Sequence, residues 1–432
     1  MITRRAVPIE RAALVGLVTG GARRVDAEHS LEELGGLAEA AGARVVLRVL
    51  QERARPDSAT FLGSGKVESL AAAASESDAD VVIFDNELSP AQLRELTKRL
   101  DRKVVDRTQL ILDIFARRAR TREGKLQVEL AQLKYLLPRL VGSSAGLSQQ
   151  GGGIGTRGPG ETKLEADRRR IRVRMKLLSD EIDVVRRRRT QLRERRQKMD
   201  APTVALVGYT NAGKTTLFNR LTRSEAEASN ALFVTLDPLV RRVALPDRRE
   251  LLLSDTVGFI DRLPHTLVAA FRATLEEIAD ADLVLHVIDA ANPEHERHVA
   301  AVTRVLEEVG ALAVPRVEIY NKVDQLSLDE RRRVQEADPA ALLISAATGQ
   351  GCDELLESVA SRVALDQQQV RLDLDLSDPA HVERLAWVYR HATVHSHATL
   401  GDRVILELAL PRRLLPKVGL ATPAAAVGGR RG

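Results

Sequence analysis

The residues GYTNAGKT, Gly208 to Thr215, specify the architecture of the central part of this 432-residue chain. They follow the apolar run TVALVG and precede a segment with helical spacing, which is the context that a phosphate-binding P-loop requires. Its glycines let backbone N–H groups curl around phosphates, Lys214 reaches the β- and γ-phosphates, and the Thr215 hydroxyl ligates Mg²⁺. The sequence therefore predicts an α/β domain with a doubly wound, mainly parallel sheet.

The residues DTVG at 255–258 follow the strand-like run LLLS and are expected on the metal side of the site. Asp255 would approach Mg²⁺ largely through water, and the Gly258 N–H would contact the γ-phosphate. Thr235, in NALFVTLDP, lies between the P-loop and DTVG, where a mobile segment can sense the γ-phosphate. An ordinary loop threonine is the alternative. We expect catalytic roles for Lys214, Thr235 and Gly258, and metal binding by Thr215, Thr235 and Asp255.

Two further motifs select the base. NKVD at 321–324 follows the run RVEIY, and the Asp324 carboxylate can accept from N1–H and the exocyclic amine of guanine, donors that adenine lacks there. SAATG begins at Ser345 and is expected to place the Ala346 N–H near the guanine oxygen. Each motif alone would also fit a turn, but the four in this order indicate GTP and GDP. The expected nucleotide contacts are Gly208, Tyr209, Thr210, Asn211, Ala212, Gly213, Lys214, Thr215, Thr216, Phe233, Val234, Thr235, Asp255, Thr256, Val257, Gly258, Asn321, Lys322, Asp324, Ser345, Ala346 and Ala347.

Phe259 follows Gly258 at the position where small regulatory GTPases carry a glutamine that orients the attacking water. An apolar side chain cannot do this. Unaided turnover should therefore be slow, and a partner or a bound cation should accelerate it. Asn211 resembles the asparagine that helps to hold the ion in potassium-activated GTPases, so K⁺ joins Mg²⁺ among the expected cofactors.

Composition places the chain among ordinary multidomain proteins. With 44% apolar and 29% charged residues it can bury sizeable cores, and its length exceeds what one core usually supports. A single cysteine excludes a disulfide framework and a cysteine-built zinc site, and 3% aromatic residues argue against base-stacking platforms. The sequence contains neither eighteen consecutive apolar residues nor a signal-peptide pattern. We expect a cytoplasmic monomer with no membrane span, at most transiently associated with a membrane.

The chain divides into four expected parts, of which 200–365 is the GTPase domain. Residues 1–120 alternate the strand-like runs RVVLRVL, ADVVIFD and KVVDR with amphipathic segments, which predicts an N-terminal α/β domain. Residues 121–199 predict a long antiparallel helical hairpin whose glycine-rich tip loop covers about 141–162. Residues 366–432 predict a small C-terminal α+β domain with a βαββ pattern and a disordered tail.

The hairpin combines a hydrophobic seam with a strongly basic stripe. In its second helix, expected from near Glu161 to about Met199, apolar residues recur every seven positions, as in a coiled coil. Between Arg168 and Lys198, twelve Arg and two Lys face four acidic residues, which suggests a polyanionic partner such as RNA. A solvated helix face is the alternative. The expected RNA contacts are Gln149, Gln150, Gly151, Gly152, Gly153, Arg157, Arg168, Arg169, Arg186 and Arg187.

The motifs GYTNAGKT, LFVTLDP, DTVGFI and NKVD, with QGGGIGTRGPGETKLEADRRRIR upstream, resemble those of the HflX GTPases. The N-terminal stretches ATFLGSGKVE, FDNELSPAQ and EGKLQVELAQLKYLLPRL are similar too. The resemblance implies a cytoplasmic GTPase whose N-terminal part docks on the large ribosomal subunit and whose glycine-rich loop approaches the peptidyl transferase centre. It also implies that the protein splits ribosomes under stress and that the ribosome stimulates hydrolysis. For some members, ATP-dependent RNA remodelling through the N-terminal domain is implied as well.

Three functions remain open at this point. The first is a GTPase that acts on ribosomes. The second is a GTPase that assists RNA modification or remodelling, which Asn211 suggests, although no methyl-donor, folate or flavin motif is evident. The third is a GTP-controlled interaction module with little turnover, which Phe259 suggests.

Overall fold

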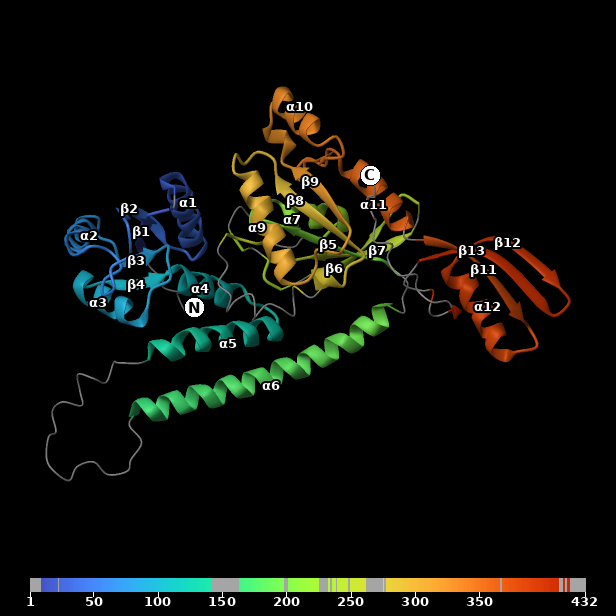
Figure 1. The fold of residues 1–432 in the computed structure, drawn as a ribbon, viewed down its shortest axis with the longest axis horizontal. Helices are drawn as coiled ribbons and strands as arrows, with labels where there is room; N and C mark the ends of the chain where they lie inside the picture. The colour runs from blue at the N-terminus through green and yellow to red at the C-terminus, as the bar shows by residue number, and fades with distance from the viewer. Residues whose placement is uncertain are drawn as a thin grey trace, which may run out of the picture.

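The protein consists of three β-sheets with their helices and one long helical hairpin, as shown by a computed structural model (Figure 1). Some predicted features lie outside the part of the chain that the structure describes. They are the glycine-rich tip at 141–162, the C-terminal tail and the predicted contact residues Gln149, Gln150, Gly151, Gly152, Gly153, Arg157 and Val234. The structure describes residues 9–21, 23–140, 163–197, 201–224, 232–233, 235–237, 239–247, 249–261, 275, 277–365, 367–411, 415 and 418–419.

The N-terminal sheet is parallel throughout, with strand order β2-β1-β3-β4. Its central strand β1 carries the run AALVGLV, which is buried over its whole length because helices cover both faces. The elements are β1 (Arg11–Thr19), α1 (Arg24–Ala40), β2 (Arg44–Arg53), α2 (Ser64–Glu76), β3 (Val81–Phe84), α3 (Pro90–Leu100), β4 (Lys103–Asp106) and α4 (Arg107–Arg118).

The predicted hairpin is formed by α5 (Arg122–Arg139) and α6 (Lys163–Gln197). Leu126 and Leu130 of α5 pack on Leu178 and Ile182 of α6, and each buried leucine contributes about 1.5–3 kcal/mol. Two ion pairs cross the hairpin, Arg174–Glu129 at 2.7 Å and Arg122–Glu181 at 2.9 Å. Their numbers run in opposite directions along the two helices, which shows that the pairing is antiparallel.

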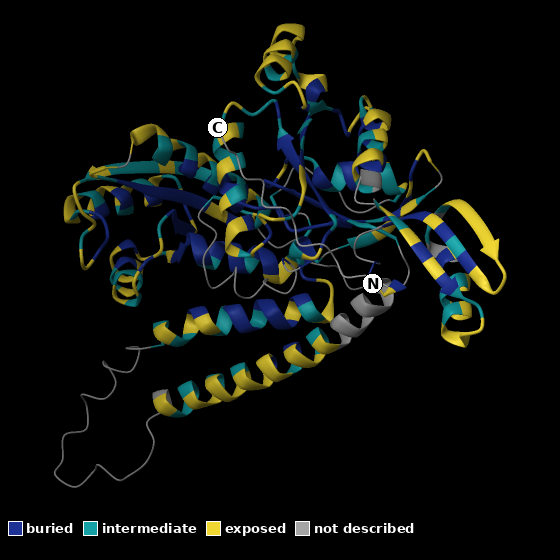
Figure 2. Ribbon diagram, turned by 45° about the vertical axis from the view of Figure 1, so that its right-hand side comes forward, coloured by how far each residue is buried: buried dark blue, intermediate teal, exposed yellow. Residues whose placement is uncertain are grey.

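Helix α5 is buried on two sides, whereas α6 is largely exposed (Figure 2). Val128, Ala131 and Tyr135 of α5 belong to the apolar cluster that also contains residues of α1 and α4, while Leu126 and Leu130 face α6. The hairpin is therefore fixed to the body through α5, and over 165–187, where burial is described, α6 presents most of its surface to solvent.

The central sheet has strand order β10-β9-β8-β5-β7-β6, and only the edge strand β6 pairs antiparallel among the described strands. The carboxyl ends of its parallel strands meet at one edge, where ligands bind in open α/β sheets. The elements are β5 (Thr203–Gly208), α7 (Lys214–Thr222), β6 (Leu239–Ala244), β7 (Glu250–Asp255), β8 (Leu283–Asp289), α9 (His295–Glu308), β9 (Arg316–Asn321), the short η1 (Val323–Gln325), α10 (Leu328–Ala337), β10 (Leu342–Leu343) and α11 (Cys352–Leu365).

The N-terminal and central units share one apolar cluster, in addition to a cluster that lies wholly within each unit. The shared cluster runs from Leu34 of α1 and Phe115 of α4 to Val207 of β5 and Val302 of α9. The C-terminal unit has its own cluster and the predicted βαββ order, with an antiparallel sheet β11-β13-β12. Its elements are β11 (Gln367–Asp375), α12 (Pro379–His391), β12 (Thr393–Leu400) and β13 (Arg403–Pro411). No described helix combines the length and apolar character needed to cross a membrane.

Candidate functional site

A cavity of about 370 Å³ opens at the carboxyl edge of the central sheet, where the predicted motifs come together. Gln325 is a lining residue that the motifs did not indicate. The predicted contacts Gly208, Tyr209, Ala212, Asp255, Val257 and Ser345 are not part of the lining. The other lining residues are Thr210, Asn211, Gly213, Lys214, Thr215, Thr216, Phe233, Thr235, Thr256, Gly258, Asn321, Lys322, Asp324, Ala346 and Ala347, all predicted.

The P-loop backbone requires glycine at two positions. Gly208 has φ 155°, and a Cβ there would overlap the Val287 carbonyl oxygen. Gly213 has φ 92° and precedes the first residue of α7, and a Cβ there would overlap Nδ2 of Asn321. The loop thus lies tightly against its neighbours, and the N-terminus of α7 is left facing the cavity, as anion binding requires.

Lys214 is buried, and its ammonium is held by the loop itself. Nζ donates to the carbonyl oxygens of Gly208 at 3.0 Å and Tyr209 at 2.8 Å. Burial lowers the pKa of Lys214 to about 8, and the nearby Asp255 carboxylate opposes this shift. The positive charge is therefore placed where phosphates would neutralise it.

Three oxygen atoms meet on the other side of the cavity. The Thr215 hydroxyl lies 2.8 Å from that of Thr235, and both donate to Asp255 Oδ2, at 2.9 Å and 3.0 Å. Asp255 Oδ1 is buried and has no hydrogen-bond partner among the described residues. Burial raises the pKa of Asp255, and Lys214 opposes this. Two hydroxyls and an incompletely bonded carboxylate are hard oxygen ligands that fit Mg²⁺, which would neutralise charge on the phosphates.

Asn321 joins the P-loop to the base-side loop. Its Nδ2 donates to the Ala212 carbonyl oxygen at 2.8 Å, and its Oδ1 accepts from the Ala346 N–H at 2.9 Å. The Ala346 N–H, predicted to lie near the guanine oxygen, thus donates to the buried Asn321 amide, and Ala346 also lines the cavity. The Asp324 carboxylate is exposed in the cavity, as recognition of a base edge requires.

Phe259 is buried and does not line the cavity. Its N–H donates to the Gly208 carbonyl oxygen at 3.1 Å, and its carbonyl oxygen accepts from the Thr210 N–H at 2.7 Å. Its ring belongs to the apolar cluster that is shared with the N-terminal unit. The side chain at the glutamine position therefore supports the fold and cannot orient a water molecule.

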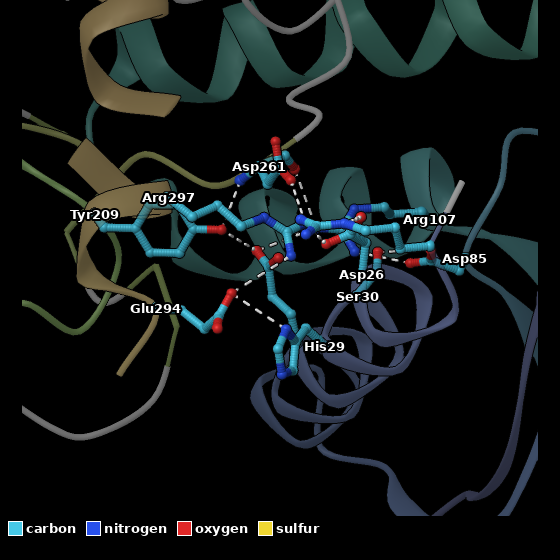
Figure 3. Close-up of polar contacts among 11 residues, drawn as sticks. Asp26, His29, Ser30, Asp85, Arg107, Tyr209, Asp261, Glu294 and Arg297 are labelled. Carbon is cyan, nitrogen blue, oxygen red and sulfur yellow. Dashed lines mark hydrogen bonds and ion pairs between the residues drawn. The ribbon is translucent and has the colours of Figure 1, made fainter. Parts of the chain in front are cut away.

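A polar network ties the P-loop to the N-terminal unit (Figure 3). The Tyr209 hydroxyl donates to Glu33 Oε1 of α1 at 2.9 Å and accepts from the Asp261 N–H at 2.7 Å. Arg297 of α9 binds the Asp261 carboxylate at 2.6 Å. Asp261 lies shortly after DTVG, so the P-loop and the segment that follows the γ-phosphate motif meet at this network.

Arg107, which belongs to the N-terminal unit, lies at the centre of this network and is only 3% exposed. Its guanidinium binds Asp85 at 2.9 Å, Glu33 at 3.1 Å and the Asp261 carbonyl oxygen at 3.1 Å. Burial alone would lower the pKa of Arg107, but Glu33 and Asp85 raise it above its usual value. The sequence motifs did not indicate these contacts. One signal was available, because Asp85 and Arg107 directly follow two buried parallel strands.

The P-loop, the converging metal-side oxygens and the base-side loop define a P-loop GTPase. Three family descriptions match the chain: "GTP-binding GTPase N-terminal" at 28–116, "GTP-binding GTPase Middle Region" at 118–196 and "50S ribosome-binding GTPase" at 203–322. The GTPase HflX of Caldanaerobacter subterraneus subsp. tengcongensis is 48% identical over 81% of this chain and 80% of its own. That of Alkalihalophilus pseudofirmus is 54% identical over 69% and 70%.

The chain belongs to the HflX family of GTPases, and it binds and hydrolyses GTP. Among solved structures, a GTP-binding protein from Sulfolobus solfataricus in complex with GDP is 24% identical. That match covers 82% of this chain and 98% of the other, with a TM-score of 0.44.

Proposed function

We propose that this protein binds the large ribosomal subunit in its GTP form and dissociates ribosomes under stress. The observation that supports the proposal most directly is the hairpin, in which a 35-residue basic helix lies along the outside of a GTPase. The match of residues 203–322 to the family described as "50S ribosome-binding GTPase" favours the large subunit. We further propose that the protein acts as a cytoplasmic monomer.

The basic face of α6 supports ribosomal RNA as the partner. Of the proposed RNA contacts on this helix, Arg169 and Arg187 are exposed, while Arg168 and Arg186 are half-buried. Arg186 lies 3.8 Å from Asp183 of its own helix, whereas Arg174 is used in the hairpin. Exposed arginines in a row bind phosphates whatever the sequence, and that binding weakens with salt.

The tip loop at 141–162 is proposed to enter an RNA-lined space. Its glycines carry no side chains, so a narrow space can admit the backbone, and Arg157 can bind phosphate there. Helix α5 is packed into the N-terminal core, so the loop would be carried on a rigid support.

The burial of Phe259 supports stimulation of hydrolysis by the ribosome. Since its side chain is buried in the shared cluster, it does not orient the attacking water, and the ribosome would supply a group that does. The nucleotide and Mg²⁺ contacts assigned above belong to the same proposal. Asn211 lines the cavity, which supports a K⁺ ion at the phosphates as a further aid.

The central experiment measures GTP turnover alone, with each ribosomal subunit and with whole ribosomes, in potassium and in sodium. The proposal expects strong stimulation by the large subunit and loss of whole ribosomes on a sucrose gradient when GTP is present. Stimulation by potassium alone would favour a GTPase that assists RNA modification. Slow turnover under every condition would favour an interaction module.

The basic stripe is tested with a matched pair of triple variants. Arg169, Arg170 and Arg172 on α6 are changed to Gln, and the exposed helix α10 supplies the control, with Arg331, Arg332 and Arg333 changed to Gln. The α6 variant should bind ribosomes more weakly, with a salt slope shallower by about 2 to 3. Equal binding and equal slopes for both variants would show that the stripe is only a solvated face.

The tip is tested by deleting Gly151 to Gly160. The deletion should leave GTP binding unchanged and abolish ribosome dissociation. A deletion variant that dissociates ribosomes normally would reduce the loop to a spacer.

A further inference from the structure

The segment around Thr235 lies against the N-terminal unit at three points. We call Leu232, Phe233 and residues 235–237 the switch segment. Leu232 is partly buried against the shared cluster. It lies close to α1, because a Cβ added to Gly36 would come within 3.2 Å of the Leu232 side chain. The second and third points are the Phe233 ring and the Asp237 carboxylate. The switch segment therefore touches the N-terminal unit on both sides of Thr235.

Phe233 fixes the first side. It is 2% exposed, and its ring centroid lies 4.7 Å from that of Phe115 in α4, with the rings at 81°. Its φ of 57° is in the left-handed region, which is costly for a bulky residue. A buried aromatic contact is what holds the backbone in this conformation.

Asp237 holds the second side of the switch segment through hydrogen bonds to the junction between α4 and α5. One of its oxygens, Oδ2, accepts from the Arg120 N–H and the Thr121 N–H, both at 2.8 Å. The other, Oδ1, accepts from the Thr121 hydroxyl. A Cβ at Gly124, in the first turn of α5, would overlap Oδ1. The carboxylate is thus seated on the start of the hairpin's first helix.

Helix α5 does not need Asp237 in order to begin. Thr121 is its N-cap residue, and the Thr121 hydroxyl accepts from the Gly124 N–H at 3.0 Å. The two N–H groups that Asp237 binds precede the helix. The Asp237 contact therefore connects two units and does not merely cap a helix.

Thr235 is the residue between these two attachments, and its hydroxyl lies 2.8 Å from that of Thr215 and 3.0 Å from Asp255 Oδ2. Two residues span at most about 7 Å of extended chain. A shift that carries the Thr235 backbone beyond this reach must therefore move Asp237 or break its bonds to Arg120 and Thr121.

We propose that Asp237 is a positioning residue that couples the γ-phosphate site to the helical hairpin. When Thr235 is held on the metal side with GTP, Asp237 holds the start of α5, and release of Thr235 with GDP loosens that junction. The inference rests on the proposed role of Thr235 as the γ-phosphate sensor but not on ribosome binding. The bound nucleotide would thereby determine how firmly the start of the hairpin is held before the protein meets any partner.

The test compares amide hydrogen exchange of the full chain with GDP and with a non-hydrolysable GTP analogue. In the wild type, the analogue should slow exchange in peptides spanning Ala119 to Leu130 by at least about fivefold relative to GDP. Asp237→Ala removes all three bonds and should abolish this difference, while P-loop peptides remain protected by either nucleotide.

Gly124→Ala is a second variant that leaves Asp237 in place. Alanine normally stabilises a helix relative to glycine, so loss of the nucleotide effect would be due to displacement of the carboxylate. Gly65→Ala, also in the first turn of a helix, is the matched control, because nothing lies within 4 Å of a Cβ there. It should keep the full nucleotide effect.

The inference would be overturned if the wild type showed no difference in exchange of α5 between the two nucleotides. It would also be overturned if the difference persisted in both Asp237→Ala and Gly124→Ala. Ribosomes are absent from this assay, so its outcome is separate from the proposed function. Failure to dissociate ribosomes, with a normal nucleotide effect on α5, would overturn the function and leave the coupling in place.

Discussion

Nucleotide binding should take up protons near pH 8 because of Lys214. In the free site, burial lowers the pKa of this ammonium to about 8. The phosphates of a bound nucleotide favour the charged form and raise that pKa again. At pH 8 about half of the free protein must therefore gain a proton on binding, whereas at pH 7 most molecules already carry it.

The size of the effect follows from the same value. Between pH 7 and pH 8.5 the protonated fraction of a group with a pKa of 8 falls about fourfold, so the affinity for GDP should fall about fourfold as well. The sign is fixed, since only the charged form is stabilised by phosphate. Affinity is highest below the free-state pKa and is lost as the pH rises through it.

The assay is titration calorimetry of GDP with Mg²⁺ at pH 8, in two buffers of different ionisation enthalpy. The difference in observed heat gives the number of protons taken up, expected near one half. Lys214→Arg is the control, because a guanidinium stays charged throughout this range and proton uptake should vanish, whatever the affinity. No proton uptake by the wild type would refute the assignment of this buried lysine to the phosphates.

Three further predictions concern single positions. Thr215→Ala should lower GTP turnover by at least about 100-fold, whereas Thr215→Ser, which keeps the hydroxyl, should retain it, and equal rates would remove this oxygen from the metal site. Asp324→Asn should weaken GTP at least about 100-fold and favour a xanthine nucleotide, and unchanged GTP affinity in direct binding would contradict guanine recognition. Gly213→Ala should destabilise the fold by about 2 kcal/mol more than Gly310→Ala in denaturant unfolding, because both have positive φ but only the former displaces Asn321. Equal losses would mean that Asn321 moves aside freely.

Local patterns were sufficient for most of the fold. The helical hairpin, the βαββ unit and the P-loop were predicted because each depends on spacing within one short stretch of chain. Two strands of the described sheets were not predicted. Strand β1 carries the continuous apolar run AALVGLV, so the signal of a buried strand was available there, whereas β6 is an edge strand with the partly polar run LVRRVA. An edge strand buries only part of its surface, so its sequence lacks the continuous apolar run of a central strand.

The nucleotide cavity could be predicted for a related reason. A motif at the end of each parallel strand must reach the same edge of the sheet, so Lys214, Thr215 and Asp324 could be brought together before their distances were known. The contact of the Tyr209 hydroxyl could not be predicted in this way. Tyr209 was predicted as a nucleotide contact, yet its hydroxyl binds Glu33, 176 positions earlier in the chain. No periodic pattern in the sequence indicates a contact between two residues so far apart in the chain.

The contacts that sequence patterns could not predict are those that connect the domains, and they share one feature. Tyr209 in the P-loop, Asp261 after DTVG and Asp237 after the switch threonine each bind the N-terminal unit close to a group that faces the phosphates. These hydrogen bonds stand beside a shared apolar cluster, and packed interfaces have few alternative arrangements, so a small shift at the nucleotide is not absorbed locally. The N-terminal unit is therefore a second support of the nucleotide site, and through α5 it transmits changes at that site to the hairpin.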